Sequence, residues 1–244
     1  MARIFITGSA DGLGQLSARL LIQQGHEVVL HARNEQRGRD AMKNAPGAEA
    51  VFTGNLSSIE ETKTLAAEVN ASGSFDAVIH NAGIYQGSGR LMFSVNTLAP
   101  FILTCMMAKP NRLIYLSSGM HLQGRASFGK LEDNIDRISY SDTKLYVLML
   151  SNAVARQWPQ ALSNAVDPGW VPTKMGGPGA PDDLQEGFHT QTWLAVSNDE
   201  KAMVSGRYFH HRKQVRHNPL ADDLSLQDQL LEICERITGV AWPL

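Results

Sequence analysis

Cysteine is scarce in this 244-residue chain, which contains only Cys105 and Cys234. The two are far apart in the sequence and belong to no metal-binding or redox motif, so we expect both to be reduced and buried. Neither sign of charge dominates, because 22 basic and 24 acidic residues leave a net charge of −2 and a pI of about 6.4. This balance argues against a nucleic-acid-binding surface and against a polyanionic tail.

Long hydrophobic runs are also lacking. No stretch comes near the roughly eighteen uninterrupted apolar residues expected of a membrane-spanning helix. The N-terminal sequence MARIFITG has too short an apolar run for a secretory signal peptide. Because 43% of the residues are hydrophobic, the chain can still bury a large core. We therefore expect a cytoplasmic protein that needs no membrane, nucleic acid or metal ion.

Short apolar or β-branched segments alternate with helical segments along the chain. The expected strands lie at residues 3–7, 26–32, 48–54, 75–80, 112–117, 161–166 and 206–210. Helices are expected at 13–24, after a capping serine at Ser57 or Ser58, and at 225–239, where Ser225 and Asp228 match a capping box. Alternation without a Pro/Gly-rich linker predicts one α/β domain over residues 1–244. Its fold class is a Rossmann-type, doubly wound parallel sheet with helices on both faces.

A glycine-rich turn, TGSADGLG, directly follows the first expected strand. Gly8, Gly12 and Gly14 lie where this strand turns into a helix, so the backbone can turn sharply and approach a pyrophosphate at the helix N-terminus. Ser17 occupies the third glycine position of the G-x-G-x-x-G motif, so that motif is not matched. The setting between strand and helix favours a nucleotide site, and the alternative is a turn that serves packing alone.

The end of the second strand should meet the adenosine ribose of a dinucleotide. There the sequence LHARN has Ala32 and Arg33 and no carboxylate. A guanidinium pairs well with a 2′-phosphate, so we expect NADP(H) to be preferred, with NAD(H) possible as well. Asp11 in the glycine-rich turn weakens this expectation through repulsion, and an ordinary surface arginine is the alternative.

Tyr140 and Lys144 lie four residues apart in the segment SYSDTKLYVLML, which we expect to form an amphipathic helix. Residues at this spacing share one helix face, so the ammonium can lower the pKa of the phenol and make it a proton donor to a carbonyl. The alternative is a half-buried tyrosine beside a solvated lysine at the rim.

Together these segments resemble the short-chain dehydrogenase/reductase family over nearly the whole chain. The long segment between Ser118 and Tyr140, which begins SSGMH, is closer to retinol-dehydrogenase-like and polyketide-ketoreductase-like members. The segments on either side of Asn96 are shorter than usual, and many relatives dimerise through the helices there, so the sequence leaves open whether the chain forms a homo-oligomer. The matching motifs are TG-x3-G-x-G at Thr7 to Gly14, NAG at Asn81 to Gly83, the catalytic Asn at Asn96, the strand-end Ser at Ser118, Y-x3-K at Tyr140 and Lys144, and PG-x3-T at Pro168 to Thr173.

The resemblance implies a role for each catalytic residue. Tyr140 is the general acid in carbonyl reduction, and Lys144 lowers its pKa and binds the nicotinamide ribose. Ser118, chosen over Ser117 by its place in the family motif, hydrogen-bonds the substrate oxygen. The carbonyl of Asn96 holds a water of a proton relay, because Pro100 has no N–H to bond it.

The resemblance also implies a cofactor site, in which Asn55 stands where many relatives have an aspartate near the adenine. The expected cofactor contacts are Thr7, Gly8, Ser9, Gly12, Leu13, Gly14, Arg33, Asn55, Leu56, Asn81, Ala82, Gly83, Tyr140, Lys144, Pro168, Gly169, Val171 and Thr173.

We therefore expect an NADP(H)-dependent oxidoreductase that acts on a ketone, an aldehyde or a secondary alcohol. Residues 174–190, rich in Gly and Pro at their start, should form a substrate lid. Trp170 and Met175 beside this lid, with Ser118 and Tyr140, should contact an apolar small molecule. The alternatives are an epimerase or dehydratase of the same fold, for which the C-terminal part is short, and a non-catalytic dinucleotide sensor, which usually loses the Tyr or Lys.

Overall fold

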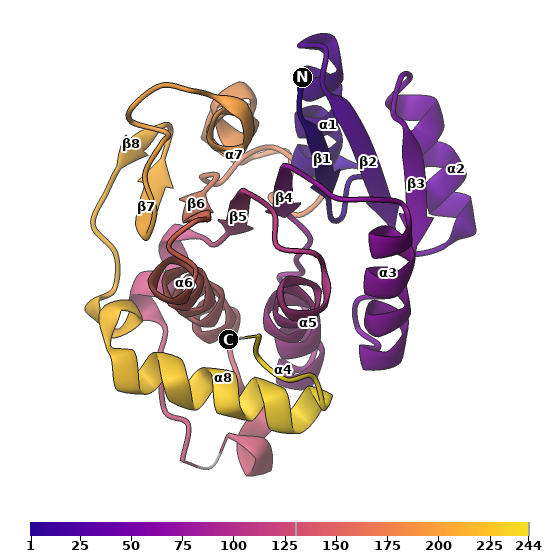
Figure 1. Cartoon of the computed structure of the whole chain (residues 1–244). Coiled ribbons are helices and arrows are strands. Elements are labelled where there is room, and N and C mark those ends of the chain that lie inside the picture. The colour runs from indigo at the N-terminus through magenta and orange to yellow at the C-terminus, as the bar shows by residue number, and fades with distance from the viewer. Residues whose placement is uncertain (130, 244) are drawn as a thin grey trace.

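The computed structural model describes residues 1–129 and 131–243, and its strands form one eight-stranded sheet in the order β3-β2-β1-β4-β5-β6-β7-β8 (Figure 1). All neighbouring strands are parallel except β7 and β8. The strands are β1 (Arg3–Ile6), β2 (Glu27–Ala32), β3 (Ala50–Thr53), β4 (Ala77–His80), β5 (Arg112–Leu116), β6 (Leu162–Asp167), β7 (Arg207–His210) and β8 (Lys213–Gln214). The predicted Rossmann-type fold class is confirmed.

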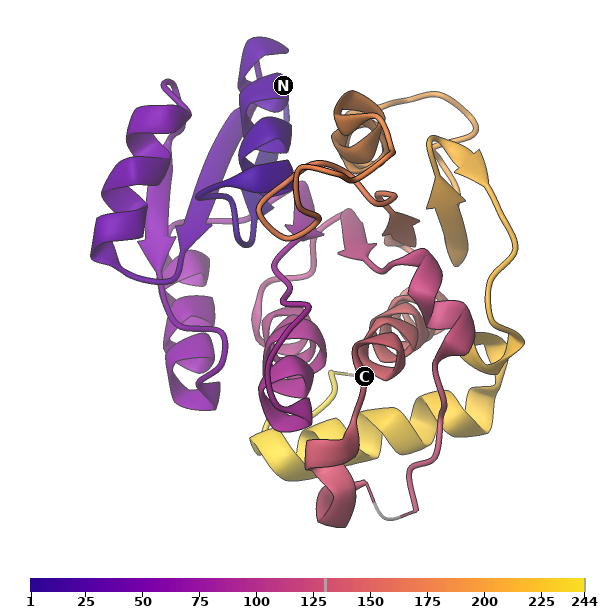
Figure 2. The same ribbon diagram turned by 180° about the vertical axis from the view of Figure 1, so that it is seen from behind.

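Helices cover both faces of the sheet (Figures 1 and 2). One face carries α1 (Gly12–Gln23), α2 (Glu35–Asn44) and α7 (Leu184–Val196). The other carries α3 (Ile59–Ala71), α5 (Ala99–Met106) and α6 (Tyr140–Gln157), with α8 (Leu224–Thr238) packed outside α6. The remaining helical segments are α4 (Gly89–Phe93), the π-helical turn η1 (Ser94–Leu98), and the 3₁₀ segments η2 (Gly119–Gln123), η3 (Glu132–Arg137) and η4 (Pro219–Asp222).

Residues along β1 show how the core forms on both sides of the sheet. Ile4 and Ile6 pack under α1 and α7, whereas Phe5 between them packs under α3, because successive side chains of a strand point to opposite faces. All three are fully buried. Strands buried on both faces are continuous apolar runs, as the sequence indicated.

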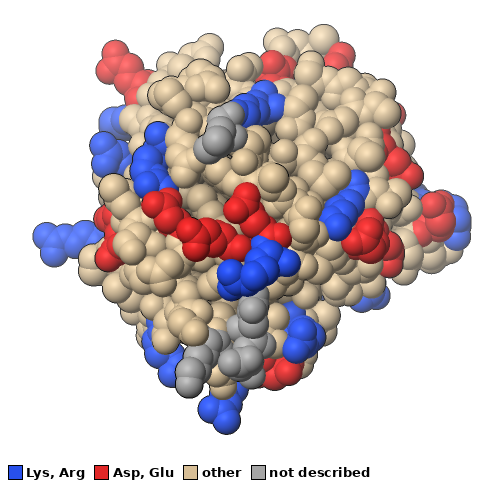
Figure 3. Space-filling model, turned by 60° about the horizontal axis from the view of Figure 1, so that its bottom comes forward, with Lys and Arg blue, Asp and Glu red and all other residues tan. Residues whose placement is uncertain are grey.

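The run Gly89–Met106 is the one helical stretch, among the described residues, whose length and composition suit a membrane span. It spans α4, η1 and α5 and is 72% buried within the fold, as in the core helix of a globular protein. On the lower side of the molecule, basic and acidic side chains are interspersed (Figure 3). The view agrees with the nearly balanced charge of the sequence.

The predicted start of the last helix is wrong. Asp223, rather than Ser225, is the N-cap of α8, and its side chain accepts a hydrogen bond from the Leu226 N–H. Ser225 lies inside the first turn, where its hydroxyl accepts from Gln229. Of the two serines considered for α3, Ser58 is the N-cap.

The helix of Tyr140 is also different from the expectation. Its start is set by a capping box between Ser139 and Asp142, so Tyr140 is the first helical residue. From Ser141 to Val154 every residue of α6 is buried, so the predicted amphipathic character is wrong. The cause is tertiary: α6 lies between the sheet on one side and α8, η2 and η4 on the others. Lys144 is thereby 5% exposed, which excludes a solvated rim position.

Candidate active site

A cavity of about 610 Å³ opens at the carboxyl ends of the central strands, between the glycine-rich turn and the start of α6. Such a position, where the strand order reverses, is where doubly wound sheets bind ligands. Fourteen of the predicted site residues line it: Gly8, Gly12, Leu13, Arg33, Asn55, Leu56, Asn81, Ala82, Gly83, Tyr140, Lys144, Pro168, Thr173 and Met175.

The glycine-rich turn leaves the N-terminus of α1 open to this cavity. Gly8 and Gly12 have φ values of 63° and 55°, in the left-handed region that side chains disfavour. A Cβ on Gly8 would lie 2.9 Å from the Cα of Ala82, so only glycine allows the two loops to pack this closely. The N-cap residue Asp11 makes no capping hydrogen bond, so the first N–H groups of α1 are uncapped by a side chain. These donors and the helix dipole fit a pyrophosphate.

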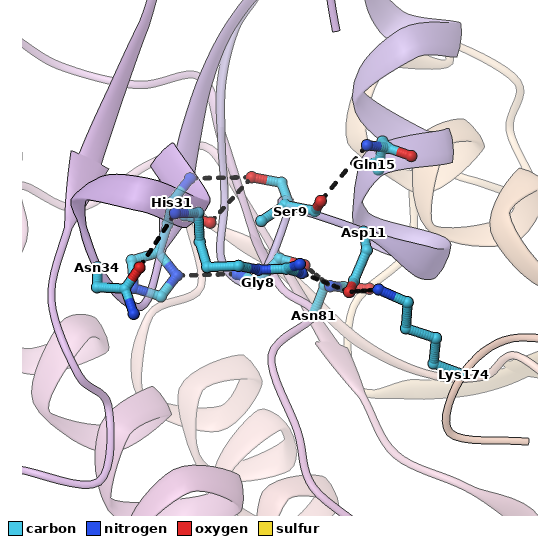
Figure 4. A network of polar contacts seen from close by, with 10 residues as sticks. Gly8, Ser9, Asp11, Gln15, His31, Asn34, Asn81 and Lys174 are labelled. Carbon is cyan, nitrogen blue, oxygen red and sulfur yellow. Dashed lines mark hydrogen bonds and ion pairs between the residues drawn. The ribbon is translucent and has the colours of Figure 1, made fainter. Parts of the chain in front are cut away.

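Ser9 was expected to contact the cofactor, and the structure places it elsewhere. Its side chain is fully buried, and its hydroxyl donates to the Ile6 carbonyl and accepts from the His31 N–H (Figure 4). Thr7 and Gly14 likewise lie behind the cavity wall. The Thr7 hydroxyl accepts from the Ala82 N–H, and a Cβ on Gly14 would lie 2.4 Å from the Asn81 side chain. These three residues support the turn without lining the cavity.

His31 holds the same turn from the second strand. Its Nδ1 accepts from the Gly8 N–H at 2.9 Å, which leaves Nε2 to donate to the Gly54 carbonyl at 2.9 Å (Figure 4). Burial lowers the pKa of His31 to about 4, so the ring is neutral near pH 7. The ring therefore fixes the glycine turn without adding charge.

The adenosine end of the cavity contains a second arginine that the sequence reading missed. Arg33 lines the cavity as predicted, and Arg37, one turn into α2, lines it too. The Arg37 guanidinium pairs with Asp11, and Lys174 donates to the same carboxylate at 3.2 Å (Figure 4). Burial would raise the pKa of Asp11, but these two hydrogen bonds outweigh it and lower the pKa. Asp11 is therefore a neutralised anion, and its expected repulsion of a phosphate is reduced.

Asn55 lines the cavity, but its side chain is engaged locally. Its Oδ1 accepts from both the N–H and the hydroxyl of Ser57, and its own N–H donates to Glu61. The side chain shapes the turn after β3, and Leu56 beside it presents apolar surface to the cavity.

Tyr140 and Lys144 lie together at the inner end of the cavity, with the Lys144 Nζ 5.5 Å from the centre of the Tyr140 ring. The expected lowering of the phenol pKa by Lys144 is absent in this ligand-free geometry. Burial raises the pKa of Tyr140 to about 12, which a hydrogen bond with Ser118 only partly opposes. Lys144 instead donates to the Leu116 carbonyl at 2.8 Å, and burial lowers its own pKa to about 8.

The two serines at the end of β5 have different surroundings. The Ser117 hydroxyl donates to the main-chain carbonyl of Lys144 at 2.7 Å and is 2% exposed. Ser118 is half-buried and accepts from the Met120 N–H at 3.3 Å, and its hydroxyl lowers the pKa of Tyr140. Ser117 lines the cavity and Ser118 does not, but the Ser117 hydroxyl is bound to the main chain of α6, whereas the Ser118 hydroxyl acts on the phenol.

Asn96 lies in the π-helical turn η1, whose main chain departs from α-helical bonding just before Pro100. Its side chain is 1% exposed and bonds both the N–H and the carbonyl of Ile84, and its Nδ2 donates to Thr143 at 3.0 Å. The side chain therefore anchors the loop after β4 to α6. Asn96 supports the site through this loop without lining the cavity.

The segment that follows β6 contributes Pro168, Thr173, Lys174 and Met175 to the cavity lining. Gly169 and Val171 do not line the cavity, although Pro168 and Thr173 do. Trp170 is 60% exposed, and its ring N–H donates to the Gly176 carbonyl at 2.8 Å. Residues 174–183 have no regular structure, as expected, and α7 begins after its N-cap, Asp183.

Tyr85 is a residue beside Tyr140 that the sequence analysis did not identify. Its ring meets the Tyr140 ring edge-on at 4.9 Å, and its side chain is 46% exposed. The one sequence signal was its position after the NAG segment.

The chain is similar to known proteins over its full length. The model of the family described as short chain dehydrogenase matches residues 2–183. An oxidoreductase of Emericella nidulans, AN7799, named as uncharacterized, is 45% identical over 100% of this chain and 99% of its own. The short-chain dehydrogenase chyC of Penicillium rubens is 38% identical over 100% of both chains. A crystal structure of an uncharacterized protein from Mycobacterium paratuberculosis superposes with a TM-score of 0.85 at 22% identity, covering 100% of this chain and 96% of that chain.

More distant matches bear on the expected branch and cofactor. Human retinol dehydrogenase 13 is 25% identical over 98% of this chain and 85% of its own. DnrU of Streptomyces sp. strain C5, provisionally named a daunorubicin C-13 ketoreductase, is 27% identical over 90% of this chain and 86% of its own. A short-chain dehydrogenase from Shigella flexneri, solved with NADP, has a TM-score of 0.69 at 21% identity, covering 87% of this chain and 97% of that chain.

Proposed function

This chain belongs to the short-chain dehydrogenase family, and on that basis we propose that it is an NADP(H)-dependent reductase of ketones or aldehydes, reversible toward secondary alcohols. The observation that carries the proposal is the pair of side chains at the inner end of the cavity, with Ser118 beside them. Tyr140 begins α6, Lys144 is buried one turn later, and the Ser118 hydroxyl acts on the phenol.

NADP(H) is the proposed cofactor because of the charges at the end of β2. Arg33 and Arg37 both line the cavity where the adenosine ribose would bind, and Ala32 replaces the carboxylate that would bind a free 2′-hydroxyl. In the described residues Arg33 has no ion-pair partner, so its guanidinium is available. The NADP complex of the Shigella flexneri structure supports this choice. NAD(H) use is the weaker alternative.

The nicotinamide, when bound, supplies or accepts the hydride. The residues of the chain bind the substrate oxygen, transfer the proton and stabilise the charge that develops. Ser118 donates a hydrogen bond to the substrate oxygen, whose negative charge grows as the hydride arrives. Tyr140 gives its proton to that oxygen, and its raised pKa keeps the proton on the phenol beforehand. Lys144 supplies a cation beside the phenolate that results, and it binds the ribose hydroxyls.

Proton return to Tyr140 involves Lys144 and the main-chain carbonyl of Asn96. Pro100 cannot donate to that carbonyl, which can therefore accept a hydrogen bond from a water of the relay. The Asn96 side chain meanwhile keeps Gly83 and Ile84 in place beside Lys144, since a Cβ on Gly83 would lie 3.2 Å from Nζ.

The substrate we propose is an apolar small molecule. Exposed Met175 and Leu91 line the cavity, and exposed Tyr85 meets the Tyr140 ring, so apolar side chains lie on the side where it would enter. The proposal also includes a cytoplasmic location, and localisation of a tagged chain by cell fractionation tests it.

Two other functions are less well supported. A nucleotide-sugar epimerase or dehydratase needs a larger substrate-binding part than the elements β7, β8, η4 and α8, which follow the lid helix among the described residues. A dinucleotide sensor has no need of the buried Lys144 beside Tyr140. A panel of aryl and alkyl ketones and aldehydes, assayed by loss of NADPH or NADH absorbance, separates these options. Cofactor binding without turnover of any carbonyl would favour the sensor.

A further inference from the structure

His121 lies in η2, the 3₁₀ turn that directly follows Ser118, and its side chain is fully buried. Two of its groups reach the main-chain carbonyl of Ser118: its own N–H at 3.0 Å and the ring atom Nδ1 at 2.7 Å. On the opposite side of the ring, Nε2 lies 3.1 Å from the main-chain nitrogen of Asn218. The ring therefore joins the serine of the site to a segment that lies 97 positions after the histidine.

These two partners determine the tautomer of His121. A main-chain N–H is a donor, so Nε2 accepts from Asn218, and the ring proton is left on Nδ1 to donate to the Ser118 carbonyl. Burial lowers the pKa of His121, so the ring is neutral near pH 7. It also packs against Tyr208 on β7, with the ring centres 4.5 Å apart. A charged ring, or the other tautomer, would put an N–H of the imidazole against the N–H of Asn218.

The hydroxyl of Ser118 depends on the same turn. It accepts from the Met120 N–H at 3.3 Å and thereby caps η2. Because this N–H engages a lone pair of the oxygen, the hydroxyl proton is directed away from the turn. The turn that carries Met120 is held to Ser118 by His121. The direction in which the serine can donate therefore depends on the histidine.

Asn218 holds η2 with its side chain as well. Its Oδ1 accepts from the Leu220 N–H at 3.1 Å and so begins η4. The side chain is 7% exposed, which keeps these bonds away from water. Its Nδ2 lies 3.3, 3.4 and 3.3 Å from the carbonyl oxygens of His121, Leu122 and Gly124, respectively.

The segment that begins with Asn218 is in turn bound to α6. Asn152, on that helix, donates through Nδ2 to the Ala221 carbonyl at 3.2 Å and to the Asp222 carboxylate at 3.0 Å. The helix that starts with Tyr140 therefore also anchors η4. A chain of buried hydrogen bonds thus runs from the serine to the helix of the tyrosine by a route outside the sheet.

We propose that His121 is a positioning residue of this site, whose neutral ring joins Ser118 to Asn218 and so directs the Ser118 hydroxyl toward the substrate oxygen. A donor that stabilises developing charge works only in the correct position, and a displacement of about 1 Å can lower the rate by about a hundredfold. This inference rests on the proposed function for its kinetic consequence, but not for the bonds of the ring.

The ring is tested first in the wild-type protein without cofactor or substrate. Histidine is labelled with ¹⁵N, the His121 signals are assigned by their loss in His121→Asn, and long-range proton–nitrogen NMR identifies the tautomer. We expect a neutral ring with its proton on Nδ1 near pH 7. A proton on Nε2, or a charged ring at that pH, would contradict the proposal.

The kinetic role is tested by a double-mutant cycle on a carbonyl that gives turnover with NADPH. His121→Phe keeps a ring against Tyr208 and removes both ring hydrogen bonds, so it should lower kcat by at least about tenfold and leave NADPH affinity unchanged. In a Ser118→Ala background there is no hydroxyl to direct, and the same change should lower kcat by less than about twofold. His121→Asn keeps a donor near the position of Nδ1 and should retain more activity than His121→Phe.

His80→Phe is the matched control, because it makes the same substitution at another buried ring, which has no bond to Ser118 or η2 among the described residues. Its kcat should stay within about twofold of wild type. If His121→Phe is poorly folded by circular dichroism, Asn218→Ala tests the same link from the other side. Equal losses in the wild-type and Ser118→Ala backgrounds, or an equal loss in His80→Phe, would overturn the role of His121 alone. No turnover of any carbonyl by wild type would overturn the proposed reductase and this role together.

Discussion

The Lys144 ammonium donates a hydrogen bond to the Leu116 carbonyl at 2.8 Å, at the end of the strand that leads to Ser118. This bond holds a buried cation against the sheet rather than against the phenol of Tyr140. The pKa of Lys144, about 8, leaves the side chain mostly protonated near pH 7. The arrangement therefore places a cation beside the phenol.

Tyr140→Phe should lower kcat for carbonyl reduction by about a hundredfold or more, because a positioned proton donor contributes about 10²–10⁴ in rate. NADPH binding should stay close to wild type, since only the phenolic hydroxyl is removed. Steady-state kinetics and fluorescence titration with NADPH measure the two effects. A variant that keeps a sizeable fraction of kcat would show that another group supplies the proton.

Arg33 should select the cofactor. One charge-assisted hydrogen bond to the 2′-phosphate contributes roughly 1.5–3 kcal/mol, which corresponds to about a ten- to hundredfold preference for NADPH. Ala32→Asp combined with Arg33→Ile should therefore shift preference toward NADH, mainly by raising KM for NADPH.

Arg37→Ala should weaken NADPH binding more than NADH binding, because it removes a second guanidinium and also uncovers the Asp11 charge. Arg39→Ala on the same helix is the control, because Arg39 donates to Gln36 and does not line the cavity. If both alanine variants had equal effects, or if wild type used NADH as well as NADPH at moderate salt, the assigned 2′-phosphate site would be incorrect.

The loop 174–183 should become more ordered when cofactor and substrate bind. In the free protein it is held at its ends: Asp182 accepts from the Trp170 N–H at 2.6 Å, and Lys174 donates to Asp11 at 3.2 Å. The hydrogen bonds of its Gly- and Pro-rich middle are local, since among the described residues they reach only Trp170, Thr173 and Gly177. Amide exchange in 174–183 should slow in the ternary complex by more than it slows in α8, which is remote from the cavity. Equal slowing, or none, would count against a lid.

Acid should destabilise the fold through His80. This ring is 2% exposed, stacks on Tyr115, and has no partner for Nδ1 among the described residues. Burial lowers its pKa from 6.5 to about 3. As the pH falls below about 6.5 the unfolded chain takes up the proton first, so the free energy of unfolding decreases, by about 2 kcal/mol between pH 7.5 and 5 from this residue.

His80→Phe keeps the stacking and removes the titration, so it should lose about 2 kcal/mol less stability than wild type over that pH range. Urea unfolding at the two pH values measures the difference. The buried His31, with its pKa lowered to about 4, stays in both proteins and should cause a shared loss over the same range. Identical pH dependence in the two proteins would mean that His80 is not buried as a neutral ring.

Much of the fold and of the site could be predicted from local signals. Strand-to-helix alternation gave the sheet, and the spacing of Tyr140 and Lys144 placed them on one helix face. What failed depended on tertiary surroundings. The phenol pKa rises because burial dominates it, and burial of α6 on all sides follows from packing against α8 and two 3₁₀ segments. No local pattern contains that information.

Two further residues illustrate the same limit. The carboxylate of Asp167 lies beside Gly119 and His210, which are 48 and 43 positions away in the sequence. These contacts form because β6 lies between β5 and β7. Arg37 had a local signal, since it follows Arg33 by four residues, but its role also depends on the glycine turn that presents Asp11 to it. The surroundings of both residues therefore depend on contacts between segments that are distant in the sequence.

Hydride transfer is the central claim, and it can be followed directly with isotope. NADPH carrying deuterium at both nicotinamide C4 positions is incubated with the enzyme and an aryl ketone that supports turnover, and the alcohol is analysed by mass spectrometry. We predict that the product gains one deuterium at the carbinol carbon with wild type and that Tyr140→Phe forms at least about a hundredfold less of it. An alcohol without deuterium, or equal labelled product from both proteins, would contradict the account.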